Sequence, residues 1–335
     1  MSVTPPSFPL FKLPQKALGT VLRSMELPQL LKLSWISART KTLIKSQNLR
    51  AVKMTVALFN DFVVELSFGE RADQKLECLF RDVTINPKRT FSDQLASLIV
   101  NKKSDTNSPK QWVYGFCKHL RSIFTWKSSE LQICPLGEEH VRRIHETFGD
   151  FDILKNYCLN RLTIHVLDTF KHARSVCLDS NPYDQLGLQK MLAQNLNSLV
   201  LGNAENHIWP PFKVCLDDLL TANTRSLTII KATITDKELN KFFRIWQKTR
   251  SNPRMEYMRI TLVREEDFEA SQILNGIEFT ECPESERRLV GSSEIYGGFD
   301  IRNTNGTVGT ILFDTKESDA NPFQLMVSVI FVIWT

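Results

Sequence analysis

The sequence predicts a mixed α/β fold, in which a small three-helix segment precedes an irregular strand-and-helix region that ends in an antiparallel hairpin. Three observations predict it. Short helical patterns fill residues 13–47, leucine-rich strand candidates alternate with helical patterns over residues 131–262, and Asn305-Gly306 separates two strand-like stretches. Hydrophobic residues make up 42% of the 335 residues, which is enough to bury a substantial core.

The three-helix segment begins at Leu13-Pro14, because proline is tolerated in the first turn of a helix, where its missing N–H would have no partner. Its first helix has apolar residues at i, i+3, i+4 and i+7, namely Leu18, Val21, Leu22 and Met25. A second helix begins near Pro28 and carries Leu30, Leu31 and Leu33. A short basic helix follows at residues 40–47. Three helices of this size enclose little core, so we expect them to pair with a partner or another domain.

Residues 49–130 are expected to form a connecting region of strands and one helix. Alternating apolar residues predict strands at residues 52–56, 62–66 and 76–85. A polar loop at residues 102–109 then leads to a helix at residues 111–124.

Leucine-rich alternation recurs in the second half of the chain and predicts strands at residues 131–133, 162–164, 199–201, 227–230 and 258–262. Helical patterns separate several of them, and the clearest is residues 236–250, where Thr235 and Glu238 form a capping-box pattern. A repeat of roughly 20–35 residues is typical of a degenerate leucine-rich repeat, which builds a curved α/β solenoid. An irregular α/β sandwich is the alternative. The apolar stretch 323–334 is too short to span a membrane and is expected to be a buried strand.

Other classes of function find little support in the residues. The net charge of +5 is nearly balanced, so a nucleic-acid binder is only an alternative to a protein that binds proteins. Seven scattered cysteines and no secretory signal favour the cytoplasm or nucleus. His140 and His145 lack the i, i+4 spacing of a helix-borne zinc pair, and no pattern indicates a cofactor, a metal or a catalytic cysteine. Trp209, in a proline-containing stretch, is a candidate anchor for a bound protein.

The leucine and proline spacing of the three-helix segment resembles an F-box. The shared pattern consists of Leu13-Pro14, Leu18, Val21-Leu22, Leu30-Leu31 and Leu33-Ser34. Gln29 stands where many F-boxes have an acidic residue, and Thr40-Lys41 where many have a tryptophan. The later stretches 217–228, 235–246, 251–257 and 297–307 resemble the type 2 F-box-associated domain of the expanded nematode F-box families.

This resemblance implies a non-catalytic subunit of a Skp–cullin–F-box ubiquitin ligase. Residues 7–48 would be the F-box, and 131–335 the F-box-associated domain that binds an unidentified protein substrate. The F-box would bind a Skp-type adaptor, and through it a cullin, by the residues Leu13, Pro14, Leu18, Val21, Leu22, Leu30, Leu31 and Leu33. Neither a nucleic acid nor a membrane would be a partner. The alternative is an F-box scaffold that acts outside a ligase, or whose F-box has decayed.

Overall fold

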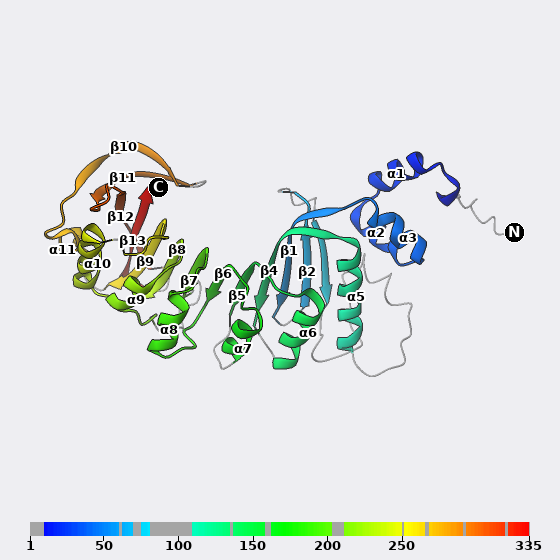
Figure 1. Cartoon of the computed structure of the whole chain (residues 1–335), viewed down its shortest axis with the longest axis horizontal. Helices are drawn as coiled ribbons and strands as arrows, with labels where there is room; N and C mark the ends of the chain where they lie inside the picture. Colours follow the sequence, from blue (N-terminus) through cyan, green and yellow to red (C-terminus); the bar gives the residue numbers. More distant parts are fainter. Residues whose placement is uncertain are drawn as a thin grey trace. The chain divides into compact units, whose positions relative to one another are not determined.

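A computed structural model describes residues 10–59, 62–69, 75–80, 109–134, 137–157, 162–202, 211–249, 251–264, 268–290, 293–318 and 321–334. By its internal contacts the chain divides into an N-terminal unit, Met1–Phe151, and a C-terminal unit, Asp152–Thr335. The class is mixed α/β, and three short helices come first, which confirms these two expectations (Figure 1). The domain bounds expected from the sequence, at residues 48 and 130, stay predictions.

The N-terminal unit begins with short helices, and their bounds are η1 (Leu10–Lys12), α1 (Gln15–Ser24), α2 (Leu27–Ser34) and α3 (Ala38–Lys45). A four-stranded sheet with two further helices follows, made of β1 (Arg50–Leu58), β2 (Phe62–Ser67), β3 (Lys75–Phe80), α5 (Pro109–Ile123), β4 (Thr125–Ile133) and α6 (Glu138–Phe148). The strand order is β4-β1-β2-β3, with β4 parallel to β1 and the other two pairs antiparallel. The sequence-predicted strand at residues 76–85 is described only as far as Phe80.

Alternation along β1 and β2 buries one face of this sheet, which includes Met54, Val56 and Val64. Helix α5 packs on that face, since the ring of Tyr114 lies 6.0 Å from Phe62 and that of Phe116 lies 5.2 Å from Phe80. The period-two pattern of the strands and the four-residue spacing of α5 therefore meet in one core.

The C-terminal unit alternates short strands and helices before a run of long strands. Its elements are β5 (Ile153–Asn156), α7 (Leu162–Thr169), β6 (Ser175–Leu178), α8 (Gln185–Leu192), β7 (Ser198–Leu201), α9 (Leu216–Thr221), β8 (Ser226–Ala232), α10 (Asp236–Lys248), β9 (Tyr257–Arg264), α11 (Ala270–Leu274), β10 (Thr280–Val290), β11 (Ser293–Arg302), β12 (Val308–Ser318) and β13 (Asn321–Trp334). Strands β5 to β9 are parallel and lie side by side in chain order (Figure 1).

Two details of this unit differ from the sequence-based expectation. Residues 162–164, predicted as a strand, begin helix α7, because Thr163, Val166 and Phe170 are buried at spacings of three and four residues. The closing antiparallel part is also larger than a hairpin: β13 pairs with β9, and the order continues through β12 and β11 to β10. The hairpin at Asn305-Gly306 is confirmed, since Arg302 pairs with Val308.

Candidate protein-docking site

The three helices divide the eight predicted adaptor-binding residues into two groups. Leu18, Leu22, Leu30, Leu31 and Leu33 are buried within the chain, and only 1% of Leu22 is exposed. Leu13 and Val21 are partly exposed and Pro14 is exposed. The five buried leucines therefore hold the helices together. Of the eight, only Leu13, Pro14 and Val21 present side chains that a partner could contact in this structure.

Local capping explains where these helices begin. Pro14 precedes the first turn of α1 with an extended backbone, which suits its fixed φ. In α2 the side chain of Gln29 accepts a hydrogen bond from the backbone N–H of Glu26 at 3.1 Å, and Pro28 lies in the first turn. Ser37 and Thr40 form the capping box of α3, with 3.2 Å between Thr40 N and Ser37 Oγ. Gln29 and Thr40, the two departures from the F-box pattern, are thus capping residues here.

Large apolar side chains that the sequence reasoning did not select are exposed next to these helices. Phe11, in η1, is 38% exposed, and Trp35 and Ile36, in the turn between α2 and α3, are 37% and 71% exposed. Scattered single apolar residues are ordinary on a protein surface, but Trp35 and Ile36 are neighbours in the sequence, and Ile36 is the most exposed of the three. The sequence signal that could have found them is the position of Trp35-Ile36 directly before the Ser37 N-cap. There they lie between two helices and not on the apolar face of either.

A contact between α2 and α5 fixes the three helices on the rest of the N-terminal unit. Ser34 Oγ lies 2.8 Å from His119 Nε2, and the Trp35 ring packs edge-on against Phe116 at 5.1 Å and His119 at 4.8 Å. Burial and, to a smaller extent, the nearby Lys41 cation together lower the pKa of His119 to about 4. A neutral imidazole therefore joins the two helices at neutral pH.

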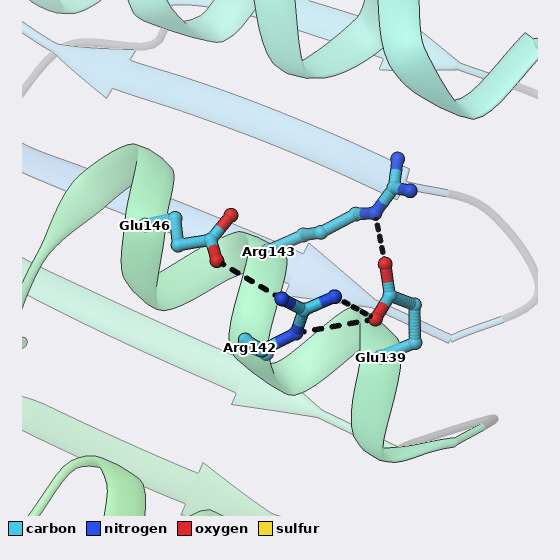
Figure 2. Close-up of polar contacts among 4 residues, drawn as sticks. All are labelled: Glu139, Arg142, Arg143 and Glu146. Atoms are coloured by element: carbon cyan, nitrogen blue, oxygen red, sulfur yellow. Dashed lines mark hydrogen bonds and ion pairs between the residues drawn. The ribbon is translucent and has the colours of Figure 1, made fainter.

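A second polar site lies between α5 and α6, where a cavity of about 380 Å³ is lined by residues of both helices. Figure 2 shows four of its lining residues: Glu139 accepts hydrogen bonds from Arg142 and Arg143, and Arg142 also lies 3.5 Å from Glu146. The guanidinium of Arg143 lies 5.8 Å from the centre of the Tyr114 ring. Hydrogen bonds from the two arginines lower the pKa of Glu139 to about 2. The carboxylates and arginines that line this cavity are paired with one another, so few charged groups are free to bind a charged ligand.

In the C-terminal unit, polar contacts tie α8, α9 and α10 to their neighbours. Gln185 donates a hydrogen bond to Asp218, and the buried Asn252 donates from Nδ2 to the carbonyl oxygens of Leu219 and Ala222 at 2.8 and 2.7 Å. The expected α10 is confirmed with its cap, since Thr235 Oγ1 accepts from the N–H of Glu238. Its apolar face is buried and consists of Leu239, Phe242, Phe243 and Trp246.

Potential metal-ligating side chains in the described ranges do not assemble into a metal-binding cluster. No three of their His, Cys, Asp or Glu side chains lie close enough together to hold a metal ion. His140 is buried on α6, while His145 is partly exposed and lies 3.5 Å from Asp150. Burial raises the pKa of the Cys78 thiol to about 12 and that of Cys117 well above its ordinary value, so neither is a nucleophile at neutral pH.

Trp209, the candidate substrate anchor, lies outside the described residues, and its role stays a prediction. Trp246 is 2% exposed and packs against Phe331 at 4.9 Å, so it belongs to the core. Within the residues that the structure covers, no helix is long and apolar enough to cross a membrane.

Comparison with known proteins gives one match. No curated protein matches the chain, and no solved structure matches it. A protein-family profile described as "F-box associated" matches residues 187–260, a range that begins within α8 and ends in β9 and includes α10 with its cap. This part of the chain is therefore similar to an F-box-associated domain.

Proposed function

We propose that the chain is a non-catalytic substrate-recognition subunit of a Skp–cullin–F-box ubiquitin ligase. The observation that carries the proposal is the order of two features: three short helices with F-box spacing precede a region that matches an F-box-associated profile. The F-box-associated family suggests recognition of a protein by the C-terminal unit. The three helices would bind a Skp-type adaptor, which holds a cullin. Recruitment raises the effective concentration of a substrate near the ubiquitin carrier, so the chain itself needs no catalytic group.

The C-terminal unit would present the substrate-binding surface. Its parallel strands β5 to β9 follow one another in chain order with a helix between each pair, as they would in a leucine-rich-repeat-like solenoid. Such a unit offers an open sheet face and a loop edge to a partner. The cytoplasm or nucleus is the expected location of this complex.

The adaptor surface is proposed to include the exposed members of the predicted set together with the apolar side chains beside them. Leu13 and Pro14, between η1 and α1, and Val21, on α1, are accessible, and Phe11 and Ile36 are exposed. Buried apolar anchors supply most of the affinity in such interfaces. The buried leucines would act indirectly, because they hold these side chains in position.

Co-purification of the full chain with a Skp-type adaptor tests the proposal. The triple variant Leu13→Ala, Pro14→Ala, Val21→Ala should lose the adaptor and keep the thermal unfolding midpoint within a few degrees, because none of the three is buried. Leu22→Ala is the matched contrast. It removes a core side chain, which costs about 2–5 kcal/mol, so it should lower stability as well as adaptor binding.

The outcomes separate the alternatives. A wild-type chain that does not bind the adaptor, or a triple variant that binds it as tightly as the wild type, would overturn the proposal. Adaptor binding without recruitment of a cullin would instead favour an interaction scaffold outside a ligase. A pull-down with and without proteasome inhibition then identifies the protein that the C-terminal unit binds.

A further inference from the structure

The positive charge of the chain is concentrated in the three-helix segment, here defined as residues 10–48. Of the chain's 42 basic and 37 acidic residues, this segment holds seven and one, which leaves 35 and 36 for the rest. The whole net charge of +5 is thus smaller than the charge of this one segment. Its seven cations are Lys12, Lys16, Arg23, Lys32, Arg39, Lys41 and Lys45.

These cations have no carboxylate partners in the part of the chain that the structure describes. The ion pairs there all involve other residues, and the one acidic side chain of the segment, Glu26, belongs to the capping box of α2. Five of the seven cations are exposed, among them Lys16 and Arg39. The charged residues of α6 differ, because their cations are paired. Glu139 forms ion pairs with Arg142 and Arg143, and Glu146 forms a second one with Arg142 (Figure 2).

An uncompensated field of this kind attracts a surface of opposite charge and speeds its association. The same segment exposes Phe11, Trp35 and Ile36, so apolar side chains occur among the cations. Apolar anchors with a charged rim are the anatomy of a protein interface. The helices are only 8–10 residues long and share a leucine core, so they offer no long basic amphipathic face of the kind that lies on a membrane.

We propose that the three-helix segment docks on an acidic face of its protein partner, and that its cations steer this association. The inference rests on the proposed function, in which the partner is a Skp-type adaptor, and it adds the chemistry of the adaptor's docking face. The cations act mainly on the rate of encounter, while the apolar contacts set the lifetime of the complex.

The charge-reversal variant Lys16→Glu, Arg39→Glu tests the proposal without disturbing the helices. Both residues lie in the first turn of their helix, where a carboxylate interacts favourably with the helix dipole. Lys127→Glu, Lys171→Glu is the matched control, since both lysines are exposed, lie outside the segment and give the same change in net charge. Stopped-flow or biosensor kinetics with a recombinant Skp-type adaptor measure both variants and the wild type.

The wild-type association rate constant should fall steeply as salt is raised from about 0.05 M to about 0.5 M. At the lower concentration the charge-reversal variant should associate about tenfold more slowly than the wild type and show little salt dependence, with its dissociation rate constant within about twofold. The control pair should match the wild type. Equal association rate constants for the charge-reversal and control variants would overturn the inference, as would a wild-type association rate constant that does not change with salt. The adaptor-binding function would stand in both cases.

Two further arms address other anionic partners. A DNA duplex and vesicles that contain phosphatidylserine are offered to the same proteins. Binding of either that is tighter than binding of the adaptor, and that is lost in the charge-reversal variant, would overturn the inference in favour of that partner. A wild type that binds no adaptor at any salt concentration overturns the proposed function itself.

Discussion

Ser34 Oγ lies 2.8 Å from His119 Nε2, which joins α2 to α5 across 85 positions of the sequence. The imidazole is neutral in this contact, and Trp35 packs edge-on against the same ring. The three-helix segment is therefore fixed on the sheet of the N-terminal unit by a hydrogen bond and by aromatic packing. If the segment binds an adaptor, this contact holds the adaptor in a fixed position relative to the N-terminal unit.

The first prediction concerns pH. Burial, and then the Lys41 cation, lower the pKa of His119 to about 4, against about 6.5 in the unfolded chain. Between these values the unfolded state binds more protons than the folded state. The contribution of neutral His119 to the stability of the N-terminal unit is therefore fully present above about pH 6.5. This contribution should decrease as the pH falls toward 4. Urea unfolding at several pH values in this window measures the decrease.

His119→Gln is the control for this prediction. Its amide can still hydrogen-bond to Ser34, but it does not titrate, so its stability should depend less on pH between about 6.5 and 4 than that of the wild type. The same pH dependence in both proteins would show that His119 is not the titrating group.

Local sequence patterns predicted those helices, caps and turns that are determined by residues close together in the sequence. The α1 stripe, the Thr235 cap and the Asn305-Gly306 turn each depend on neighbours in sequence, and all three were found. The start of α7 was wrong, because three alternating residues at 162–164 suit a strand as well as one turn of a helix. Strands β5 and β6 were missed because each has a single leucine, whereas β7, which also has four residues, has two leucines and was predicted.

The candidate site was less predictable for a physical reason. Spacing shows which residues share a helix face, but not whether that face turns to the chain's own core or to a partner. Leu22 and Val21 are adjacent in the F-box pattern, yet one is buried and the other partly exposed. The contact of Ser34 with His119 depends on tertiary packing, which no local pattern reports.

The second prediction concerns two glycines that differ in the room around them. A Cβ at Gly309 would lie 2.5 Å from ring atoms of Phe331 and 3.1 Å from Trp246, and both rings are buried in the core. Gly309→Ala should therefore cost about 1–3 kcal/mol through overpacking. Around Gly115, in the middle of α5, nothing lies within 4 Å of such a Cβ. Gly115→Ala should stabilise by about 0.5–1 kcal/mol, since alanine loses less backbone entropy in a helix. Equilibrium unfolding of both variants checks the opposite signs, and a shift in the same direction would contradict this account.

The third prediction concerns the cap of α10, within the part that matches the F-box-associated profile. Thr235 Oγ1 accepts a hydrogen bond from the Glu238 N–H at 3.3 Å, and the Glu238 carboxylate accepts one from the Thr235 N–H at 3.0 Å. Thr235→Ala should destabilise the C-terminal unit by about 1 kcal/mol, because it leaves an N–H of the first turn without its partner. Thr235→Ser keeps the hydroxyl and should cost much less. An equal loss in both variants, measured by urea unfolding, would assign the effect to the methyl group instead.

The fourth prediction concerns Asp300 of β11, which ties the outer strands of the C-terminal unit together. Its carboxylate accepts hydrogen bonds from Arg288 Nη1 at 2.9 and 3.0 Å and from Thr310 Oγ1 at 2.5 Å, and Trp334 Nε1 donates to the same Thr310 oxygen at 2.7 Å. Burial alone would raise the pKa of Asp300, but the hydrogen bonds from Thr310, Arg288 and Cys282 outweigh it and lower the pKa below its ordinary value. The ionised carboxylate therefore stabilises the fold, and this contribution is present above about pH 4 and lost as the pH falls through the folded pKa.

Asp300→Asn should remove about 1–2 kcal/mol at pH 7, because the amide keeps the shape of the side chain but lacks the charge that Arg288 faces. Amide hydrogen exchange of β11 and β12 measures the change in this part of the chain, and the exchange rates there should rise in the variant. At about pH 3 the two proteins should differ less, since the aspartate of the unfolded wild type is then largely protonated and the ionised carboxylate contributes less to stability. A difference that stays the same at both pH values would show that shape or packing, rather than the charge of Asp300, holds β10 to β12.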